Sequence, residues 1–328
     1  MRQLMISLDK NILNKDSAVA RRMIEYGKEK ELFIIIPDRG TEVFDLSSTV
    51  HVQSTGGNKL LQFFRLLYLS KNIIHNSKFI IQNSLVTVQD PFFTGLIGWL
   101  LKKKFKIKLE MQMHGDFFSD YYKRQWLKLS LAKFVLKRAE TIRVVGERIK
   151  QSLLNLNISE NKIIVRSVPI DAEFIKNYQP KINLHEKYPS YEKIFLVLGR
   201  LDPVKNIPWL IEVFKEVAKQ KNFLLLIVGG SLEEGKLMFN VPCSMFHKNI
   251  AFEPWTNDPI SYLKTADCLL FPSLSEGYGL VPMEASVVGT PVIMNDVGVA
   301  NYELKPSENV KILPINNKDA LVKAILEI

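Results

Sequence analysis

The sequence predicts an α/β protein built from two doubly wound domains, each a parallel sheet with helices on both faces. Its 328 residues exceed the length of about 100–200 residues that a single core usually serves. Short apolar runs alternate with amphipathic helical segments from one end of the chain to the other, which is typical of parallel sheets buried on both faces. The alternation breaks once, over residues 167–192, where a polar stretch with three prolines predicts a linker.

The first predicted domain spans residues 1–180. Its expected strands are short apolar runs, and its expected helices carry apolar residues three and four positions apart. The strands are predicted at residues 4–8, 32–37, 79–82, 107–113, 141–145 and 163–165. The helices are predicted at residues 17–30, 58–72, 92–104, 124–138 and 147–156.

The second predicted domain spans residues 181–328, where the same alternation restarts. Its strands are predicted at residues 194–198, 223–228, 249–252, 268–271, 291–294 and 310–313, and its helices at residues 206–219, 259–265, 281–288 and 319–328. Ligands of doubly wound sheets bind outside the carboxyl ends of the strands. Two such domains that face each other would therefore hold a ligand in the cleft between them.

The strongest chemical signal is a segment that begins at Glu276, ends at Glu284 and follows a predicted buried strand. Pro282 suits the first turn of a helix, which predicts Glu276 in a loop and Glu284 in the first helical turn. Gly277 and Gly279 let the backbone approach a ligand, and N–H groups at a helix start favour phosphate or sugar oxygens. The segment therefore suits a hydroxyl-rich ligand; a turn followed by an acid that the helix dipole stabilises is the alternative.

A second candidate segment begins at Gly199, where a predicted strand ends, and leads into a predicted helix. Arg200 and Lys205 can converge on a diphosphate, the arginine through its planar fork and the lysine as a point charge. A nucleotide diphosphate becomes a good leaving group only when its charge is stabilised. Two solvated basic residues are the alternative, but cations are mildly unfavourable at a helix start, which favours a functional role.

Residues 194–305 resemble the donor domain of glycosyltransferase family 4, the retaining group with the GT-B fold. The signatures of this family are a Gly-Arg-Leu-x-x-x-Lys-Asn segment and a Glu-x7-Glu segment, followed by Gly-Thr-Pro-Val and a glycine-containing loop. This sequence carries them in order at Gly199–Asn206, Glu276–Glu284, Gly289–Val292 and Val297–Val299. The combination is specific, whereas each piece alone is common.

The resemblance implies a retaining, metal-independent hexosyltransferase that uses a nucleotide diphosphate sugar as donor and needs no cofactor. Arg200 and Lys205 would bind the diphosphate, Glu276 would contact the donor sugar beside the amides of residues 278–280, and Glu284 would bind the ribose. The implied donor-binding set is Gly199, Arg200, Lys205, Glu276, Gly277, Tyr278, Gly279, Leu280 and Glu284. The second domain would then bind the donor, and the first domain would lie on the acceptor side.

A candidate in the first domain is His114, which follows the predicted strand 107–113. It is similar to the histidine of the family that reaches the cleft and contacts the donor sugar, and a lone surface or core histidine is the alternative. The implied catalytic set is therefore His114, Arg200, Lys205 and Glu276.

The sequence also departs from the family pattern. Residues 9–17 replace the usual Gly-Gly loop after the first strand, which bears on the acceptor-side contacts. Glu253 and Pro254 replace the usual glycine after strand 249–252, and the stretch between Gly230 and Lys248 is short. The chain stops at Ile328 inside its last predicted helix, whereas family members continue into a helix that returns to the first domain. We expect a truncation or a minimal variant.

Positive charge is concentrated in the amino-terminal part. Residues 1–180 hold 29 basic and 17 acidic residues, a net charge of +12, whereas residues 181–328 hold 15 and 17, a net charge of −2. Residues 102–108 carry five lysines behind the apolar segment 92–101, and further basic residues follow between positions 123 and 138. Basic groups beside apolar residues suit an anionic membrane surface, and a solvated face is the alternative. No nucleic-acid recognition module accompanies the charge.

Metal and compartment signals are sparse. The two cysteines, Cys243 and Cys268, have no paired spacing, and no Asp-x-Asp segment or His/Cys cluster occurs, so we expect no disulfide framework and no metal site. No secretory signal is recognisable, and no apolar run has the roughly 20 residues that span a bilayer. We expect a cytoplasmic protein, peripheral at the inner membrane face.

Three functions would use these residues. The first is a glycosyltransferase with a glycan or lipid-linked acceptor, in polysaccharide or glycolipid biosynthesis. The second is a sugar-nucleotide epimerase or hydrolase with the GT-B fold, and the third is a non-catalytic subunit that binds a nucleotide sugar. Donor breakdown without an acceptor would favour the second, and nucleotide binding without turnover would favour the third.

Overall fold

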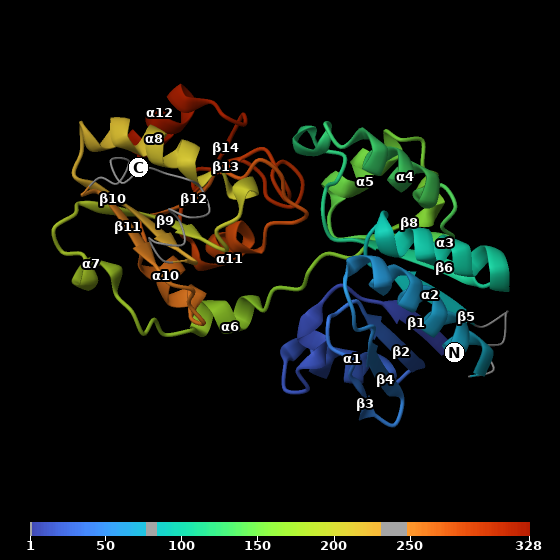
Figure 1. Ribbon diagram of the computed structural model, residues 1–328. Coiled ribbons are helices and arrows are strands. Elements are labelled where there is room, and N and C mark those ends of the chain that lie inside the picture. The colour runs from blue at the N-terminus through green and yellow to red at the C-terminus, as the bar shows by residue number, and fades with distance from the viewer. Residues whose placement is uncertain (1, 77–83, 231–247) are drawn as a thin grey trace. The chain divides into compact units, whose positions relative to one another are not determined.

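The computed structural model describes residues 2–76, 84–230 and 248–328, which form two compact units (Figure 1). The first unit consists of residues up to Phe118 with Tyr122–Val145 and Ile149–Arg166, and the second consists of Ser167–Ile328 with Ser119–Tyr121 and Gly146–Arg148. The sequence placed the division at residues 180/181. In the structure, residues 167–180 belong to the second unit and include a short helix, α6 (Ala172–Asn177).

The first unit contains an eight-stranded sheet with the order β3-β4-β2-β1-β5-β6-β7-β8. The strands are β1 (Arg2–Ile6), β2 (Glu31–Ile36), β3 (Val43–Ser47), β4 (Val50–Ser54), β5 (Ser84–Val88), β6 (Lys108–Met113), β7 (Thr141–Val144) and β8 (Ile163–Val165). Neighbouring strands are parallel except for the edge pair β3 and β4. The predicted doubly wound α/β fold is therefore confirmed for this unit, with an antiparallel edge that the sequence analysis missed.

The helices of the first unit are α1 (Ala18–Gly27), α2 (Lys59–Asn76), α3 (Phe93–Phe105), α4 (Trp126–Leu136) and α5 (Glu147–Leu154). Helices α2, α3 and α4 follow β4, β5 and β6, and each connection moves in the same direction along the sheet. Since such crossovers are right-handed, these three helices cover one face, and α1, whose connection runs the other way, covers the opposite face. No described helix is long and apolar enough to cross a membrane.

One central strand lies where the sequence analysis did not place it. The predicted strand 79–82 falls outside the described residues. The strand that pairs with both β1 and β6 is β5, Ser84–Val88. Its residue Thr87 is fully buried and accepts a hydrogen bond of 2.7 Å from the side-chain amide of Gln3 on β1.

The second unit contains a six-stranded, all-parallel sheet with the order β11-β10-β9-β12-β13-β14. The strands are β9 (Lys193–Leu198), β10 (Phe223–Val228), β11 (Ile250–Glu253), β12 (Cys268–Phe271), β13 (Val292–Asn295) and β14 (Val310–Leu313). The helices are α6, α7 (Leu184–Lys187), α8 (Ile207–Ala218), α10 (Pro259–Thr265), α11 (Leu280–Val288) and α12 (Lys318–Leu326). Every residue of β10 is buried, as expected for a strand covered on both faces.

The strand order fixes where a ligand of the second unit should bind. Counted along the chain within this unit, the order is 3-2-1-4-5-6, the arrangement of dinucleotide-binding folds. The winding direction reverses between the neighbours β9 and β12. Ligands of such sheets bind outside the carboxyl ends of the strands at this switch point.

Candidate functional site

Both candidate segments of the second unit start at the switch point. Gly199 directly follows β9, and the loop of residues 272–279 directly follows β12 and leads into α11. The backbone N–H of Leu274 in this loop donates to the carbonyl oxygen of Val204 at 2.8 Å, which joins the two segments. The structure therefore brings together two motifs that are about 70 residues apart in the sequence, in agreement with the general rule for ligand sites.

The carboxyl ends of β9 and β10 touch backbone to backbone. Gly229 has a φ of +141°, and a Cβ atom there would lie 1.8 Å from the carbonyl oxygen of Gly199. Gly199 has a φ of +147°. Only glycine allows both this backbone conformation and this approach, so the two glycines fix the path of the chain into the Arg200 segment.

A short helical turn directs Lys205 back toward the end of β9. The turn spans Pro203–Lys205 and is capped by Asp202, whose carboxylate accepts from the N–H of Val204 at 3.0 Å. A Cβ atom on Gly199 would lie 3.9 Å from Cε of Lys205, so the lysine stem folds over the glycine. Arg200, in contrast, is exposed to solvent.

Lys205 and Glu276 form the central contact of the site. The Nζ atom of Lys205 lies 2.5 Å from Oε1 of Glu276, and the side chains are only 21% and 16% exposed. The same ammonium group lies 4.8 Å from the centre of the Phe271 ring, at the end of β12. Partial burial strengthens this ion pair relative to one in bulk water, and it places a cation and a carboxylate at the switch point.

A second glycine contact holds the start of α11. Gly298 has a φ of +55°, and a Cβ atom there would lie 2.0 Å from the carbonyl oxygen of Tyr278. That oxygen accepts a 2.7 Å hydrogen bond from the N–H of Val299. Gly279, with a φ of +106°, is the N-cap, and α11 starts at Leu280. The loop Val297–Val299, which contains Gly298, thus fixes the position of the first residues of α11 and of their N–H groups.

The helix α11 starts one residue before the predicted helix 281–288, so the prediction that Glu284 lies in the first helical turn is wrong. Since α11 begins at Leu280, Glu284 is its fifth residue and lies in the second turn. Burial raises the pKa of its carboxyl group above the ordinary value. Glu284 lines a pocket of about 330 Å³ together with residues of α6 and of the loop before α10, among them Phe174 and Asp258. A carboxyl group beside such a pocket can accept hydrogen bonds from ligand hydroxyls.

His114 follows β6 at the carboxyl edge of the first unit's sheet, as predicted. Part of its ring is exposed, yet the surrounding residues remove enough water to lower its pKa below the ordinary value. The positive charges of Arg143 and Arg22 lower this pKa further. A lowered pKa favours the neutral form of His114, and a neutral imidazole can both donate and accept a hydrogen bond.

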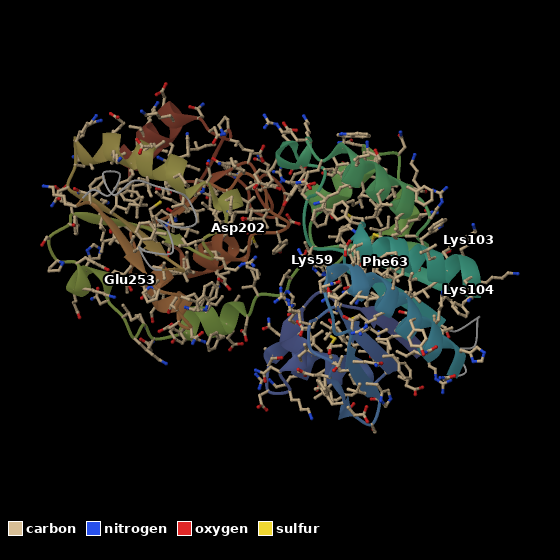
Figure 2. All side chains as sticks on the ribbon, in the orientation of Figure 1. Lys59, Phe63, Lys103, Lys104, Asp202 and Glu253 are labelled. Carbon is tan, nitrogen blue, oxygen red and sulfur yellow. The ribbon has the colours of Figure 1, made fainter. Side chains whose placement is uncertain are left out.

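Glu253, which departs from the family pattern, anchors the end of β11. The residue, which is labelled in Figure 2, is 6% exposed. Its carboxylate accepts hydrogen bonds of 2.6 Å from the hydroxyls of Tyr188 and Tyr262. Lys187 pairs with it at 2.8 Å. Its backbone oxygen accepts from the N–H of Gly229 at 3.1 Å. Sequence analysis recognised only the missing glycine, because the partners of Glu253 are distant in the sequence: Tyr262 lies on α10, Lys187 ends α7 and Tyr188 directly follows it.

The environment of Glu253 predicts a pH-dependent contribution to stability. Burial alone would raise its pKa, but the bonds from Lys187, Tyr188 and Tyr262 outweigh burial and lower the pKa below 4.5. A group with a depressed pKa stabilises the fold above its unfolded pKa and loses this effect as the pH falls. Glu253→Gln is therefore expected to lower the free energy of unfolding at pH 7 by about 1–3 kcal/mol.

Urea unfolding of the wild type and of Glu253→Gln between pH 3 and pH 8 measures this effect. The difference between the two proteins should shrink as the pH falls below about 4.5. Glu216→Gln is the matched control, since Glu216 also has a lowered pKa and a lysine partner, but its side chain is 41% exposed. A difference for Glu253→Gln that stays constant with pH would contradict the role of its charge.

The site therefore contains only a few kinds of functional group. It combines a cation, Lys205, a carboxylate, Glu276, and the N–H groups at the start of α11, with Arg200 beside Gly199. Cations and a helix start suit a diphosphate, and the carboxylate suits hydroxyl groups. Within the described part of the chain, no group of three or more His, Cys, Asp or Glu side chains is placed to hold a metal ion.

Comparisons with known proteins agree with the resemblance to glycosyltransferases that the sequence motifs indicated. Residues 180–328 match the family described as "Glycosyl transferases group 1". The "UDP-Gal:alpha-D-GlcNAc-diphosphoundecaprenol alpha-1,3-galactosyltransferase" of Escherichia coli is 25% identical over 252 residues, which cover 72% of this chain but only 64% of that protein, less than two thirds of its length. The trehalose synthase of Pyrococcus horikoshii is 26% identical over 306 residues, 86% of this chain and 70% of that protein.

A solved structure shows the same fold. The sucrose-phosphate synthase from Thermosynechococcus elongatus superposes with a TM-score of 0.76 at 19% identity, covering 100% of this chain and 89% of that chain. This likeness confirms the predicted GT-B fold of two Rossmann-like domains. The sequence match to the group 1 glycosyl transferases is carried by residues 180–328, the domain that holds the candidate site.

Proposed function

We propose that the protein is a glycosyltransferase that takes a hexose from a nucleotide diphosphate sugar. The observation that carries this proposal is the ion pair of Lys205 and Glu276 at the switch point of the second unit, beside the start of α11. In the proposal, Arg200 and Lys205 bind the diphosphate, Glu276 binds the sugar and Glu284 binds the ribose. The backbone of Gly199 and of residues 277–280 lines the donor.

The proposed chemistry follows from charge. When the bond between the anomeric carbon and the donor phosphate breaks, negative charge develops on the diphosphate. Lys205, Arg200 and the N–H groups at the start of α11 would stabilise this charge without large rearrangement, because they are already positioned. In line with the family resemblance, we assign His114 to the donor sugar and propose a reaction that retains the anomeric configuration and uses no metal ion or cofactor.

The proposed acceptor is a glycan or a lipid-linked sugar, in polysaccharide or glycolipid biosynthesis. The name of the Escherichia coli relative states that it acts on a sugar linked to diphosphoundecaprenol, and this chain matches 64% of that protein. The net charge of +12 on residues 1–180 supports a peripheral location at an anionic membrane surface, the inner face, where a lipid-linked acceptor would be presented.

Nucleotide-sugar binding and turnover test this function. We expect one class of nucleotide sugar to raise the melting temperature, because a ligand at 100 times its Kd stabilises the folded state by about 2.7 kcal/mol. With that donor and a lipid-linked acceptor, we expect a glycosylated product whose formation survives EDTA. The absence of any thermal shift with all common nucleotide sugars would contradict the proposal.

The same assay separates the alternatives. Donor breakdown at equal rates with and without acceptor would indicate an epimerase or hydrolase. Binding without turnover against any acceptor would indicate a non-catalytic subunit. Activity that EDTA abolishes and that Mg²⁺ or Mn²⁺ restores would show that the diphosphate is neutralised by a metal ion instead of by Arg200 and Lys205 alone.

A further inference from the structure

Three neighbouring helices of the first unit carry positive charge without any negative charge. Helices α2, α3 and α4 contain no aspartate or glutamate, and their basic residues are Lys59, Arg65, Lys71, Lys102, Lys103, Lys104, Lys128 and Lys133. A solvated helix usually mixes both signs, as α8 does, where Lys215 pairs with Glu212 at 3.0 Å. The uniform sign of these three helices therefore suggests a binding surface for a negatively charged partner.

The same helices expose large apolar side chains. On α2, Leu60, Leu61, Phe64 and Tyr68 are 78%, 47%, 66% and 63% exposed, and they lie opposite the buried residues Leu66, Ser70 and Ile74. On α4, Trp126 and Leu127 are 66% and 65% exposed. Grouped apolar side chains of this kind mark contact surfaces, whereas scattered ones do not.

Packing keeps the apolar strip of α2 on the outside. Phe63, the neighbour of Phe64, lies against Phe93 of α3, with ring centres 5.3 Å apart. This contact fixes the rotation of α2 about its axis. Leu60 and Phe64 consequently lie on the side of α2 that faces away from the sheet. Their combination with nearby cations is the pattern of an amphipathic helix that lies on a membrane surface.

The apolar residues and the lysines of α3 lie at opposite ends of the helix layer. Lys59 and Phe63 lie at the start of α2, and Lys103 and Lys104 lie at the far end of α3 (Figure 2). Since α2 and α4 follow the carboxyl ends of β4 and β6, the apolar residues at their starts share the sheet edge of His114.

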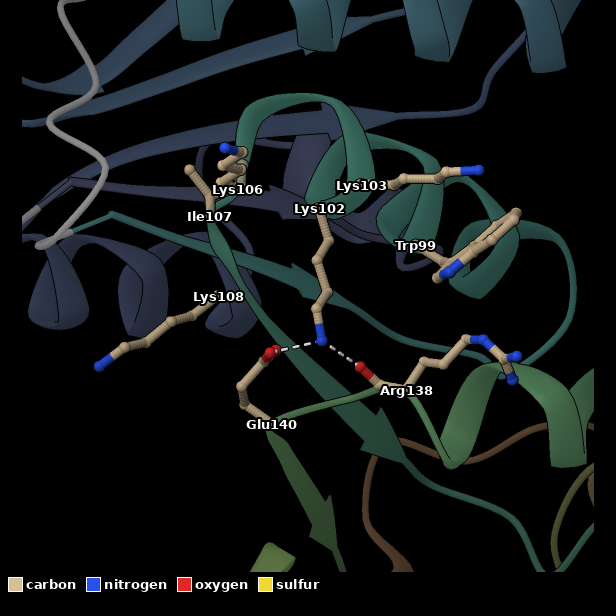
Figure 3. A pocket seen from close by; sticks show the side chains of 8 residues that line it. All are labelled: Trp99, Lys102, Lys103, Lys106, Ile107, Lys108, Arg138 and Glu140. Atoms are coloured by element: carbon tan, nitrogen blue, oxygen red, sulfur yellow. Dashed lines mark hydrogen bonds and ion pairs between the residues drawn. The ribbon is translucent and has the colours of Figure 1, made fainter.

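Four of the five lysines of residues 102–108 line a pocket at the other edge. This pocket of about 480 Å³ is lined by Trp99, Arg138 and the lysines at 102, 103, 106 and 108 (Figure 3). Lys102 is already bound to Glu140 and to the carbonyl oxygen of Arg138. Lys108 begins β6 and His114 follows it, so roughly 20 Å of strand separates them. Docking through residues 102–108 alone would therefore present the wrong edge of the sheet to the membrane.

We propose that the outer face of α2, α3 and α4 docks on an anionic lipid bilayer. Leu60, Leu61 and Phe64 at the start of α2, with Trp126 and Leu127 at the start of α4, enter the headgroup region, and the lysines hold anionic headgroups. A bilayer offers charge and an apolar phase together, whereas a soluble polyanion offers charge alone. The inference rests on the proposed function in one respect, namely that the acceptor is linked to a lipid. Docking would bring such an acceptor to the edge of the sheet at which His114 lies.

Vesicle flotation of the full chain tests this surface. We expect binding to phosphatidylglycerol–phosphatidylcholine vesicles, little binding to pure phosphatidylcholine, and weaker binding at 0.5 M salt because salt screens the charge. Leu60→Ser/Phe64→Ser and Lys103→Glu/Lys104→Glu should each lower the partition coefficient about tenfold or more. Emission of Trp126, isolated as the difference between the wild type and Trp126→Phe, should shift to the blue and be quenched by brominated lipid.

Matched variants make the result specific. Val43→Ser removes an apolar side chain that is 75% exposed on β3, and Lys219→Glu/Lys221→Glu changes the net charge equally in the second unit; both should bind vesicles like the wild type. Two outcomes overturn the proposal. One is vesicle binding that the Leu60→Ser/Phe64→Ser variant leaves unchanged. The other is binding of the protein to dextran sulfate as tightly as to vesicles, with full displacement of the vesicles by dextran sulfate. Nucleotide-sugar binding, measured without vesicles, reports separately on the proposed function.

Discussion

Replacing Lys205 with alanine is expected to lower kcat/KM for the nucleotide sugar by about 30-fold to about 900-fold. This range corresponds to about 2–4 kcal/mol of transition-state stabilisation, as found for other preorganised charge donors. The variant removes the cation that lies 2.5 Å from Glu276 and leaves that half-buried carboxylate unpaired where the diphosphate is proposed to bind. Arg200→Ala is expected to fall in the same range, and steady-state kinetics with a nucleotide diphosphate binding assay measures both.

Lys215→Ala is the matched control for Lys205→Ala. Lys215 also pairs with a glutamate, at 3.0 Å, and its side chain is 24% exposed, against 21% for Lys205. Both variants therefore lose the ammonium group of a partly buried lysine, although Glu212 is 51% exposed against 16% for Glu276, and only Lys205 belongs to the proposed site. Unchanged turnover in both Arg200→Ala and Lys205→Ala would end the assignment of the diphosphate site.

Gly229→Ala is expected to lower the free energy of unfolding by about 3 kcal/mol or more and to weaken donor binding. A backbone conformation that essentially only glycine adopts costs a residue with a Cβ atom roughly 1–3 kcal/mol. In addition, the new methyl group would lie 1.8 Å from the carbonyl oxygen of Gly199 and 3.4 Å from the N atom of Arg200. One of the two strand ends must then move, and such backbone shifts add further cost and displace Arg200.

Gly289→Ala measures the energetic cost of a positive φ without the cost of a steric clash at the Cβ atom. Gly289 also has a positive φ, +94°, but a Cβ atom there would meet no atom within 4 Å. Its variant should lose only about 1–2 kcal/mol and should bind the nucleotide normally. Urea unfolding measures the loss of unfolding free energy in both variants, and nucleotide titration measures their affinity. Equal losses of unfolding free energy, with unchanged nucleotide affinity in both variants, would show that the close approach of Gly199 and Gly229 does not constrain the site.

The fold of the second unit was largely readable from the sequence. The predicted strands 223–228, 268–271 and 310–313 and the helix 259–265 coincide with β10, β12, β14 and α10. Strands β10 and β12 are continuous apolar runs in which every residue is buried, because both of their faces are covered, and such runs end sharply at polar or turn residues. The position of Glu284 was wrong because a proline in the first turn does not specify at which residue of that turn the helix starts.

The two missed features of the first unit have a different physical origin. In the hairpin of β3 and β4, exposed Val43 and Asp45 alternate with the half-buried Phe44 and Leu46, a period-two pattern of a strand with one covered face. A search for continuous apolar runs does not find such a strand. Likewise β5, Ser84–Val88, contains a buried serine and a buried threonine, so it is not an apolar run, and the side chain of Thr87 is hydrogen-bonded to Gln3 of the neighbouring strand β1.

The class of fold and the residues of the proposed donor site could be derived from local sequence patterns. Local periodicity predicts strands and helices, and the spacing of glycines, cations and carboxylates predicts a diphosphate-binding motif. Which of these groups meet became clear only from the folded chain: Lys205 contacts Glu276, Glu253 contacts Tyr188 and Tyr262, and Gly229 contacts Gly199. The tertiary structure also placed the apolar residues of α2 at the sheet edge of His114 and the lysines of residues 102–108 at the other. The reason is that strand order and helix rotation arise from packing between segments distant in the chain, which no local pattern encodes.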